Sequence, residues 1–121
     1  MNNRILIVDD RKNIRQAVSR CLELNGYRTS QAINGREAVK AADLGDVALI
    51  LMDVVMPEMT GPAAAARIRE EHSDLPIIHM SSYNPGTTPG SGRLDRFLPK
   101  PFRVEELLRE IEDLLVPSGA A

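Results

Sequence analysis

The sequence predicts an α/β domain built on a doubly wound, five-stranded parallel sheet, and three observations support this prediction. Short apolar runs alternate along the chain with segments whose apolar residues recur at helical spacing. One run, Val47–Met52, is apolar throughout, which is typical of a strand covered on both faces of a parallel sheet. The 121 residues are enough for one compact domain and too few for two, so we expect a single domain over residues 1–121.

The first part of the chain is predicted to form a strand, a helix and a second strand. Arg4–Val8 is a short apolar run stopped by two aspartates. The helix that follows is indicated by apolar residues at Ile14, Ala17, Val18, Cys21 and Leu22. Gly26 suits the left-handed position that ends many helices, and a weaker strand is expected over Tyr27–Ala32.

The middle of the chain predicts two further helices around the apolar strand. Asn34 followed by Glu37 resembles an N-cap with an acid three residues later, and the helix is expected to run to about Leu44. A third helix is predicted to open at Gly61-Pro62, because proline is well placed in a first turn.

Two strands and a helix are predicted for the last third. The strands are expected over Pro76–Met80 and Leu94–Leu98. The final helix is indicated by one apolar stripe, formed by Val104, Leu107, Leu108, Ile111, Leu114 and Leu115. Residues 116–121 are expected to be a flexible tail.

The segment Ser82–Arg93 breaks the alternation of strands and helices. It contains two prolines and three glycines, which oppose a regular helix. We therefore expect the helix between the fourth and fifth strands to be short, irregular or missing, with a long loop in its place.

Polar residues follow the ends of four predicted strands. Asp9 and Asp10 end the first strand, Asp53 the third and Ser81 the fourth, while Lys100 follows the fifth. Because functional groups gather at the carboxyl ends of parallel strands, three carboxylates are expected to converge there. Like charges at close range resist joint ionisation, and a divalent cation with a preference for oxygen ligands, such as Mg²⁺, relieves that repulsion.

Such a pocket could support phosphoryl transfer to a carboxylate. An Asp53 oxygen could attack an in-line phosphorus and form an acyl phosphate, while the Lys100 ammonium and the metal neutralise charge. Taken singly, each residue has a commoner role, such as helix capping by Asp10 or a turn at Asp53. Their joint placement at strand ends is what favours the functional interpretation.

Four motifs resemble the receiver domain of two-component response regulators, over Arg4 to about Val116. They are Ile7–Asp10, Leu51–Gly61, Pro76–Ser81 and Phe97–Phe102. The resemblance implies a flavodoxin-like fold with strand order 2-1-3-4-5. It also implies a switch domain that catalyses only its own phosphorylation and dephosphorylation, and so is not an enzyme in the usual sense.

The resemblance further implies a role for each residue of the pocket. Asp53 would be the phosphorylated aspartate, and Mg²⁺, with Mn²⁺ as a substitute, would be held by Asp9, Asp10, Asp53 and the backbone carbonyl of Val55. Ser81 and Lys100 would bind the phosphoryl group. Phe97 would be the aromatic switch that turns inward when Ser81 moves, and the Lys100–Pro101 peptide would be cis.

The expected phosphoryl donor is a sensor histidine kinase or a phosphotransfer protein, and the downstream partner is a protein. A net charge of −2 argues against nucleic-acid binding by this chain, because neutralising phosphates requires a basic face. No apolar run approaches the roughly 20 residues needed to span a membrane. With one cysteine and no secretion signal, a cytoplasmic location is expected.

Two other classes of function are compatible with parts of this pattern. A degenerate receiver that binds partners independently of phosphorylation is suggested by the irregular Tyr83–Arg93 segment. A flavin mononucleotide carrier is disfavoured because Asp9 and Asp10 would repel the flavin phosphate. An aspartate-nucleophile phosphatase more often has a second acid two residues after the nucleophile, where this chain has Val55. His79 is expected to pack in the core.

Overall fold

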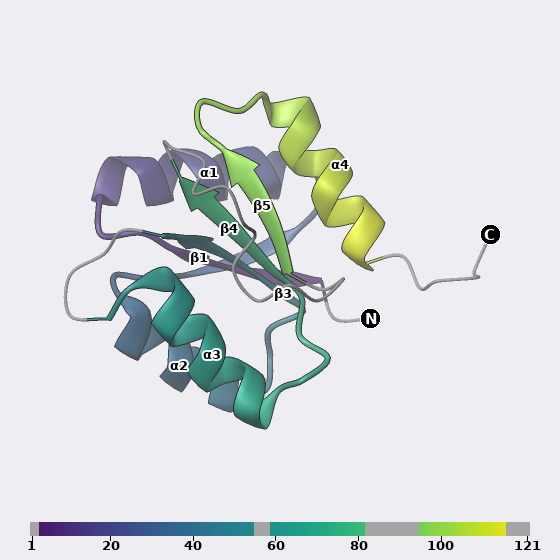
Figure 1. The fold of residues 1–121 in the computed structure, drawn as a ribbon. Coiled ribbons are helices and arrows are strands. Elements are labelled where there is room, and N and C mark those ends of the chain that lie inside the picture. The colour runs from purple at the N-terminus through teal and green to yellow at the C-terminus, as the bar shows by residue number, and fades with distance from the viewer. Residues whose placement is uncertain (1–2, 55–58, 82–94, 116–121) are drawn as a thin grey trace.

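Five strands and four helices make up the described part of the chain, which comprises residues 3–54, 59–81 and 95–115 of a computed structural model (Figure 1). In chain order they are β1 (Arg4–Val8), α1 (Lys12–Leu24), β2 (Arg28–Ala32), α2 (Gly35–Asp43), β3 (Leu49–Asp53), α3 (Gly61–Glu71), β4 (Ile77–Ser81), β5 (Asp95–Pro99) and α4 (Val104–Leu115).

All strand pairs are parallel, in the order β2-β1-β3-β4-β5. Helices α1 and α4 cover one face of the sheet, and α2 and α3 cover the other (Figure 1). The predicted α/β fold and strand order are confirmed.

The expectations for 82–93 and for the tail at 116–121 lie outside the described residues. Among the residues the structure describes, no helix has the length and apolar character that crossing a membrane requires.

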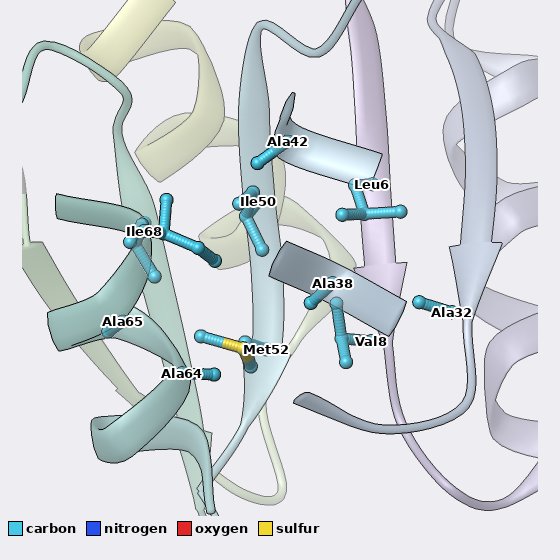
Figure 2. Packing of buried hydrophobic residues seen from close by; sticks show 11 residues of the cluster. Leu6, Val8, Ala32, Ala38, Ala42, Ile50, Met52, Ala64, Ala65 and Ile68 are labelled. Carbon is cyan, nitrogen blue, oxygen red and sulfur yellow. The ribbon is translucent and has the colours of Figure 1, made fainter. Parts of the chain in front are cut away.

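Strand β3 is buried from both sides, which explains its continuous apolar sequence. Ile50 and Met52 pack with α2 and α3, whereas Leu49 and Leu51 pack on the face of α1 and α4. Successive side chains of a strand point to opposite faces, so each apolar residue finds a cover. We call the apolar cluster on the face of α2 and α3 the first cluster, and that on the face of α1 and α4 the second cluster. Figure 2 shows the first cluster, in which small alanines such as Ala64 of α3 let the helices approach the sheet closely.

The helix ends follow the predicted local chemistry, with one exception. The Asn34 side chain accepts a hydrogen bond from the Glu37 N–H at 2.9 Å, and Gly26 after α1 has a φ of 92°. The exception is the start of α1, where Arg11 is the N-cap and its own side chain makes no capping hydrogen bond. Asp10 therefore does not play the capping role considered for it.

The strand ends lie slightly further along the chain than the apolar runs suggest. The run Val47–Met52 becomes Leu49–Asp53, and the next strand extends to Ser81. The polar residues Asp53 and Ser81 are thus the last members of hydrogen-bonded strands. Strand β5 is at the edge of the sheet, where Pro99 is tolerated although it has no N–H to donate.

Candidate functional site

One end of the sheet gathers the charged residues that the sequence singled out. Asp9 directly follows β1, Asp53 is the last residue of the neighbouring β3, and Lys100 follows β5. One oxygen each of Asp9, Asp10 and Asp53 lies within 4.8 Å of the others. Asp9 is 0% exposed and Asp53 is 6% exposed, while Asp10 is open to solvent. Two nearly buried carboxylates at this range require compensating positive charge.

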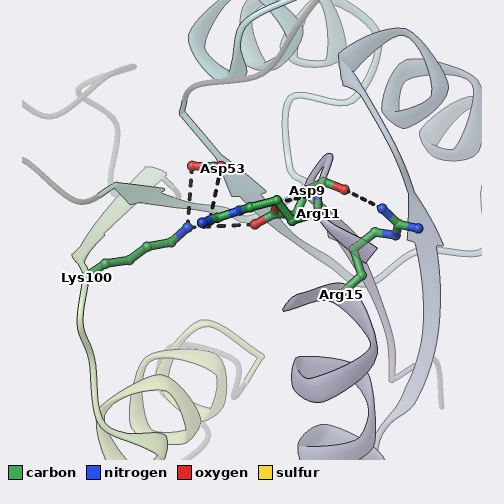
Figure 3. A network of polar contacts seen from close by, with 5 residues as sticks. All are labelled: Asp9, Arg11, Arg15, Asp53 and Lys100. Atoms are coloured by element: carbon green, nitrogen blue, oxygen red, sulfur yellow. Dashed lines mark hydrogen bonds and ion pairs between the residues drawn. The ribbon is translucent and has the colours of Figure 1, made fainter. Parts of the chain in front are cut away.

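Two cations supply that charge in a crossed arrangement (Figure 3). The Lys100 Nζ lies 3.7 Å from Asp9 Oδ2 and 3.7 Å from Asp53 Oδ1. The Arg11 guanidinium uses the other oxygen of each acid, with Nε 3.3 Å from Asp9 Oδ1 and Nη2 3.9 Å from Asp53 Oδ2. Each cation therefore bridges both carboxylates, and all four carboxylate oxygens lie near a positive group.

Arg11 is anchored by its own backbone as well as by its side chain. Its N–H donates to Asp9 Oδ1 at 2.9 Å, which fixes the turn between β1 and α1. The side-chain hydrogen bond to Asp9, the charge of Asp9 and, more weakly, the charges of Asp53 and Asp10 raise the pKa of the Arg11 guanidinium above its ordinary value. The side chain is nevertheless 52% exposed.

Arg15 lies one turn along α1 and supports the same loop differently. Its Nη1 donates to the backbone oxygen of Asp9 at 2.9 Å, and its Nε donates to the Gln31 side chain at 3.2 Å. In Figure 3 it approaches Asp9 from the side away from Lys100. Arg15 thus positions the backbone of the acid, whereas Arg11 neutralises its carboxylate.

The backbone around Asp53 is fixed by close packing. The N–H of Val54 donates to Met80 O at 2.9 Å, and the N–H of Gly61 donates to Val54 O at 3.0 Å. A Cβ on Gly61 would overlap the Asp53 carbonyl oxygen and lie 2.9 Å from the Val54 Cα. Only glycine lets α3 begin so near the end of β3.

The structure places two of the remaining predicted residues on β4 and β5. Ser81 is buried at the end of β4, and its carbonyl oxygen accepts from the Lys100 N–H at 2.6 Å. Phe97 is half-buried in β5, paired in register with His79. Val55 lies outside the described residues. The Lys100–Pro101 peptide is cis, as the resemblance implied.

Sequence reasoning missed Arg11. The clue available in the sequence was a basic residue directly after the acidic pair Asp9-Asp10. That spacing alone does not say whether the guanidinium turns inward or into solvent, because an N-cap residue can direct its side chain either way.

The pocket suits a hard divalent cation. Three carboxylates offer oxygen ligands, which Mg²⁺ prefers. Within the described part of the chain, the buried Oδ2 of Asp9 accepts no hydrogen bond, although buried acceptors are nearly always satisfied. A metal ion at the acids would satisfy this oxygen, so the residues present fit Mg²⁺.

The match to a family model and the matches to individual proteins agree with one another. The family model described as response regulator receiver domain matches residues 5–112. The response regulator MprA of Mycolicibacterium vanbaalenii is 37% identical over 117 residues, covering 93% of this chain and 50% of MprA. The chain therefore spans about half the length of the curated relatives it matches.

Solved structures agree with this match. The response regulator TrrA of Thermotoga maritima, in complex with Mg²⁺-BeF, matches with a TM-score of 0.85 and 33% identity, covering 93% of this chain and 99% of TrrA. A structure of the histidine kinase ThkA in complex with TrrA matches with a TM-score of 0.83 and 34% identity, covering 93% of this chain and 98% of the matched one. The range matched by the family model includes the whole pocket, from Asp9 to Lys100.

Proposed function

We propose that Asp53 is the phosphoacceptor of this chain. The premise is that the chain belongs to the response regulator receiver domains, which are the phosphoacceptor switches of two-component signalling. The observation that supports this assignment best is the position of Asp53. It ends a central strand, is almost buried, and faces a lysine and two further acids.

The proposed reaction needs little covalent chemistry from the protein. An Asp53 carboxylate oxygen forms a bond to phosphorus while the bond from phosphorus to the donor breaks, and its electron pair leaves with the donor group. The Lys100 ammonium lies beside Asp53 Oδ1, where it would neutralise negative charge on the oxygens of the transferred phosphoryl group. The Ser81 hydroxyl is assigned a hydrogen bond to one of them.

Mg²⁺ is the proposed cofactor, with Mn²⁺ as a substitute. Asp9, Asp10, Asp53 and the carbonyl of Val55 are the proposed ligands. When bound, the ion would supply positive charge that stabilises the transferring phosphoryl group. The related TrrA was solved with Mg²⁺-BeF, which supports this choice.

The proposed output is a change of conformation. Phosphorylation adds roughly −1.5 to −2 charges at neutral pH. That charge would draw Ser81 and Lys100 inward, and we assign to Phe97 the role of following Ser81 and altering the surface offered to a partner. Such a change biases an existing equilibrium between two arrangements.

The proposed phosphoryl donor is a sensor histidine kinase or a phosphotransfer protein, and the proposed location is the cytoplasm. The complex of TrrA with the histidine kinase ThkA supports the choice of donor. The downstream target is proposed to be a protein, because the net charge of −2 does not favour nucleic acid.

The test is labelling by a small acyl-phosphate donor with Mg²⁺, followed by mass spectrometry. Asp53→Asn is expected to abolish labelling, because an amide cannot act as the nucleophile. Asp74→Asn, which changes an exposed aspartate preceding β4, is the control and should label like the wild type. Full labelling of Asp53→Asn at another residue would defeat the assignment. Partner binding that is unchanged in both Asp53→Asn and Asp53→Glu would favour the phosphorylation-independent module instead.

A further inference from the structure

The pocket contains one more cation than the proposed chemistry uses. Lys100 has a place in phosphoryl transfer, but Arg11 has none in the scheme above. Its guanidinium nonetheless lies against the same two acids that would hold the metal, at 3.3 Å from Asp9 and 3.9 Å from Asp53. A positive group in this place competes with any ion that binds those oxygens.

The crossed arrangement makes that competition direct. Lys100 lies beside Asp9 Oδ2 and Asp53 Oδ1, and Arg11 lies beside Asp9 Oδ1 and Asp53 Oδ2. A divalent ion that takes an oxygen of Asp53 must therefore share it with one of the two cations or displace that cation. Arg11 is the more easily displaced, because its side chain is 52% exposed and that of Lys100 only 19%.

We propose that Arg11 is a tethered counter-cation that neutralises Asp9 and Asp53 in the metal-free protein and gives way to Mg²⁺, so that it sets the Mg²⁺ concentration at which the pocket fills. This inference rests on the proposed function, since it assumes that the acids bind Mg²⁺. It adds a residue that tunes metal loading, distinct from the ligands themselves.

A purely structural role for the Arg11 side chain is the alternative. Against it, the backbone N–H of Arg11 already holds Asp9 Oδ1 at 2.9 Å, and Arg15 holds the backbone oxygen of Asp9 at 2.9 Å. Both contacts remain when the Arg11 side chain is shortened. The guanidinium is thus not needed to place the acid, and its remaining effect is electrostatic.

The decisive experiment is a calorimetric titration of the full chain with MgCl₂ at low ionic strength. Arg11→Gln is expected to lower the Mg²⁺ dissociation constant about three- to tenfold, which is the equilibrium equivalent of two partly exposed ion pairs. Lys12→Gln is the matched control. It removes the same charge from the neighbouring residue, an exposed lysine at the start of α1 that, among the described residues, forms no ion pair with Asp9 or Asp53, so a change of about twofold or less is expected.

Equal dissociation constants for the two variants would overturn the inference while leaving the proposed function intact. Failure of the wild type to bind Mg²⁺ at millimolar concentrations would instead overturn the proposed metal site. The melting temperature provides a second measurement. At one sub-saturating MgCl₂ concentration, the rise in Tm over the EDTA sample should be larger for Arg11→Gln than for Lys12→Gln. An equal rise would contradict competition at the acids.

Discussion

At the scale of single residues, the absence of a Cβ at Gly61 allows α3 to begin close to Asp53. The Gly61 N–H binds Val54 O, and an added Cβ would overlap the Asp53 carbonyl. We expect Gly61→Ala to lower the free energy of unfolding by about 1–3 kcal/mol, the usual cost of overpacking. Urea unfolding followed by circular dichroism would measure it.

Gly26→Ala provides the comparison for that variant. Among the described residues other than its two chain neighbours, no atom lies within 4 Å of a Cβ at Gly26, so the cost of this variant comes from a left-handed φ of 92°. Labelling at Asp53 should slow in Gly61→Ala and stay unchanged in Gly26→Ala. A Gly61→Ala protein as stable as the wild type would show that the backbone at Asp53 can shift freely.

The sequence predicted some of these residues and not others, for a physical reason. Asp53 and Lys100 could be placed because strand ends are set by the apolar pattern, and parallel strands end at one edge. The inward turn of Arg11 depends on the backbone of one N-cap residue, with φ −98° and ψ 115°, which no apolar period encodes. Nor does the pattern reveal the close approach at Gly61.

At the scale of elements, a buried polar network joins α3 to the two last strands. Arg69 of α3 donates to Asp95 Oδ1 at 3.0 Å, and His79 Nε2 lies 3.4 Å from the same oxygen. His79 is fully buried in β4, as the sequence led us to expect. Burial lowers the pKa of His79 below 6.5, and the charge of Arg69 adds to this, while Asp95 opposes it.

This network predicts a pH dependence of stability. Well above pH ~6.5, the ordinary pKa of histidine, the side chain is neutral in both the folded and the unfolded chain. Below that value the unfolded chain binds a proton that the folded chain resists, so stability falls with falling pH, by at most about 1.4 kcal/mol per pH unit. Measured by urea unfolding between pH 7.5 and 5.5, the free energy of unfolding should depend less steeply on pH in His79→Gln than in the wild type. His72→Gln is the control, and a slope that vanished with His72 instead would contradict this origin.

The bounds of the elements were predictable only to within one or two residues. An apolar run reports burial, whereas a strand is defined by its hydrogen bonds. Asp53 is paired in register with Met80, so β3 continues one residue past its last apolar side chain. The sequence also could not predict the partner of His79, because the register of the sheet, and not spacing along the chain, brings Asp95 close to it.

At the scale of the whole molecule, two apolar clusters share one sheet. Ile68 of α3 belongs to the first cluster and Ile111 of α4 to the second, and both are buried. Because β3 contributes to both clusters, we expect the two faces to unfold together. Ile68→Ala and Ile111→Ala should each cost about 2–5 kcal/mol in a single transition.

In a Tyr83→Phe background, Tyr27 is the one remaining tyrosine, and it packs against the second cluster. Coincident urea curves from circular dichroism and tyrosine fluorescence of that protein would establish this cooperativity. Separate transitions for the two variants would show that the faces are independent.

The layered fold itself was predictable from the alternation of strands and helices. The order of the strands was not, and it came only from the resemblance to a known family.

The crossed cations have a consequence for the order in which a newly made chain becomes competent. Asp9, Asp53 and Arg11 are synthesised well before Lys100, which reaches the acids only when β5 has joined the edge of the sheet. A nascent chain that stops short of that strand holds Asp53 without Lys100. In the proposed scheme, competence for phosphorylation therefore arrives only once β5 has joined the sheet.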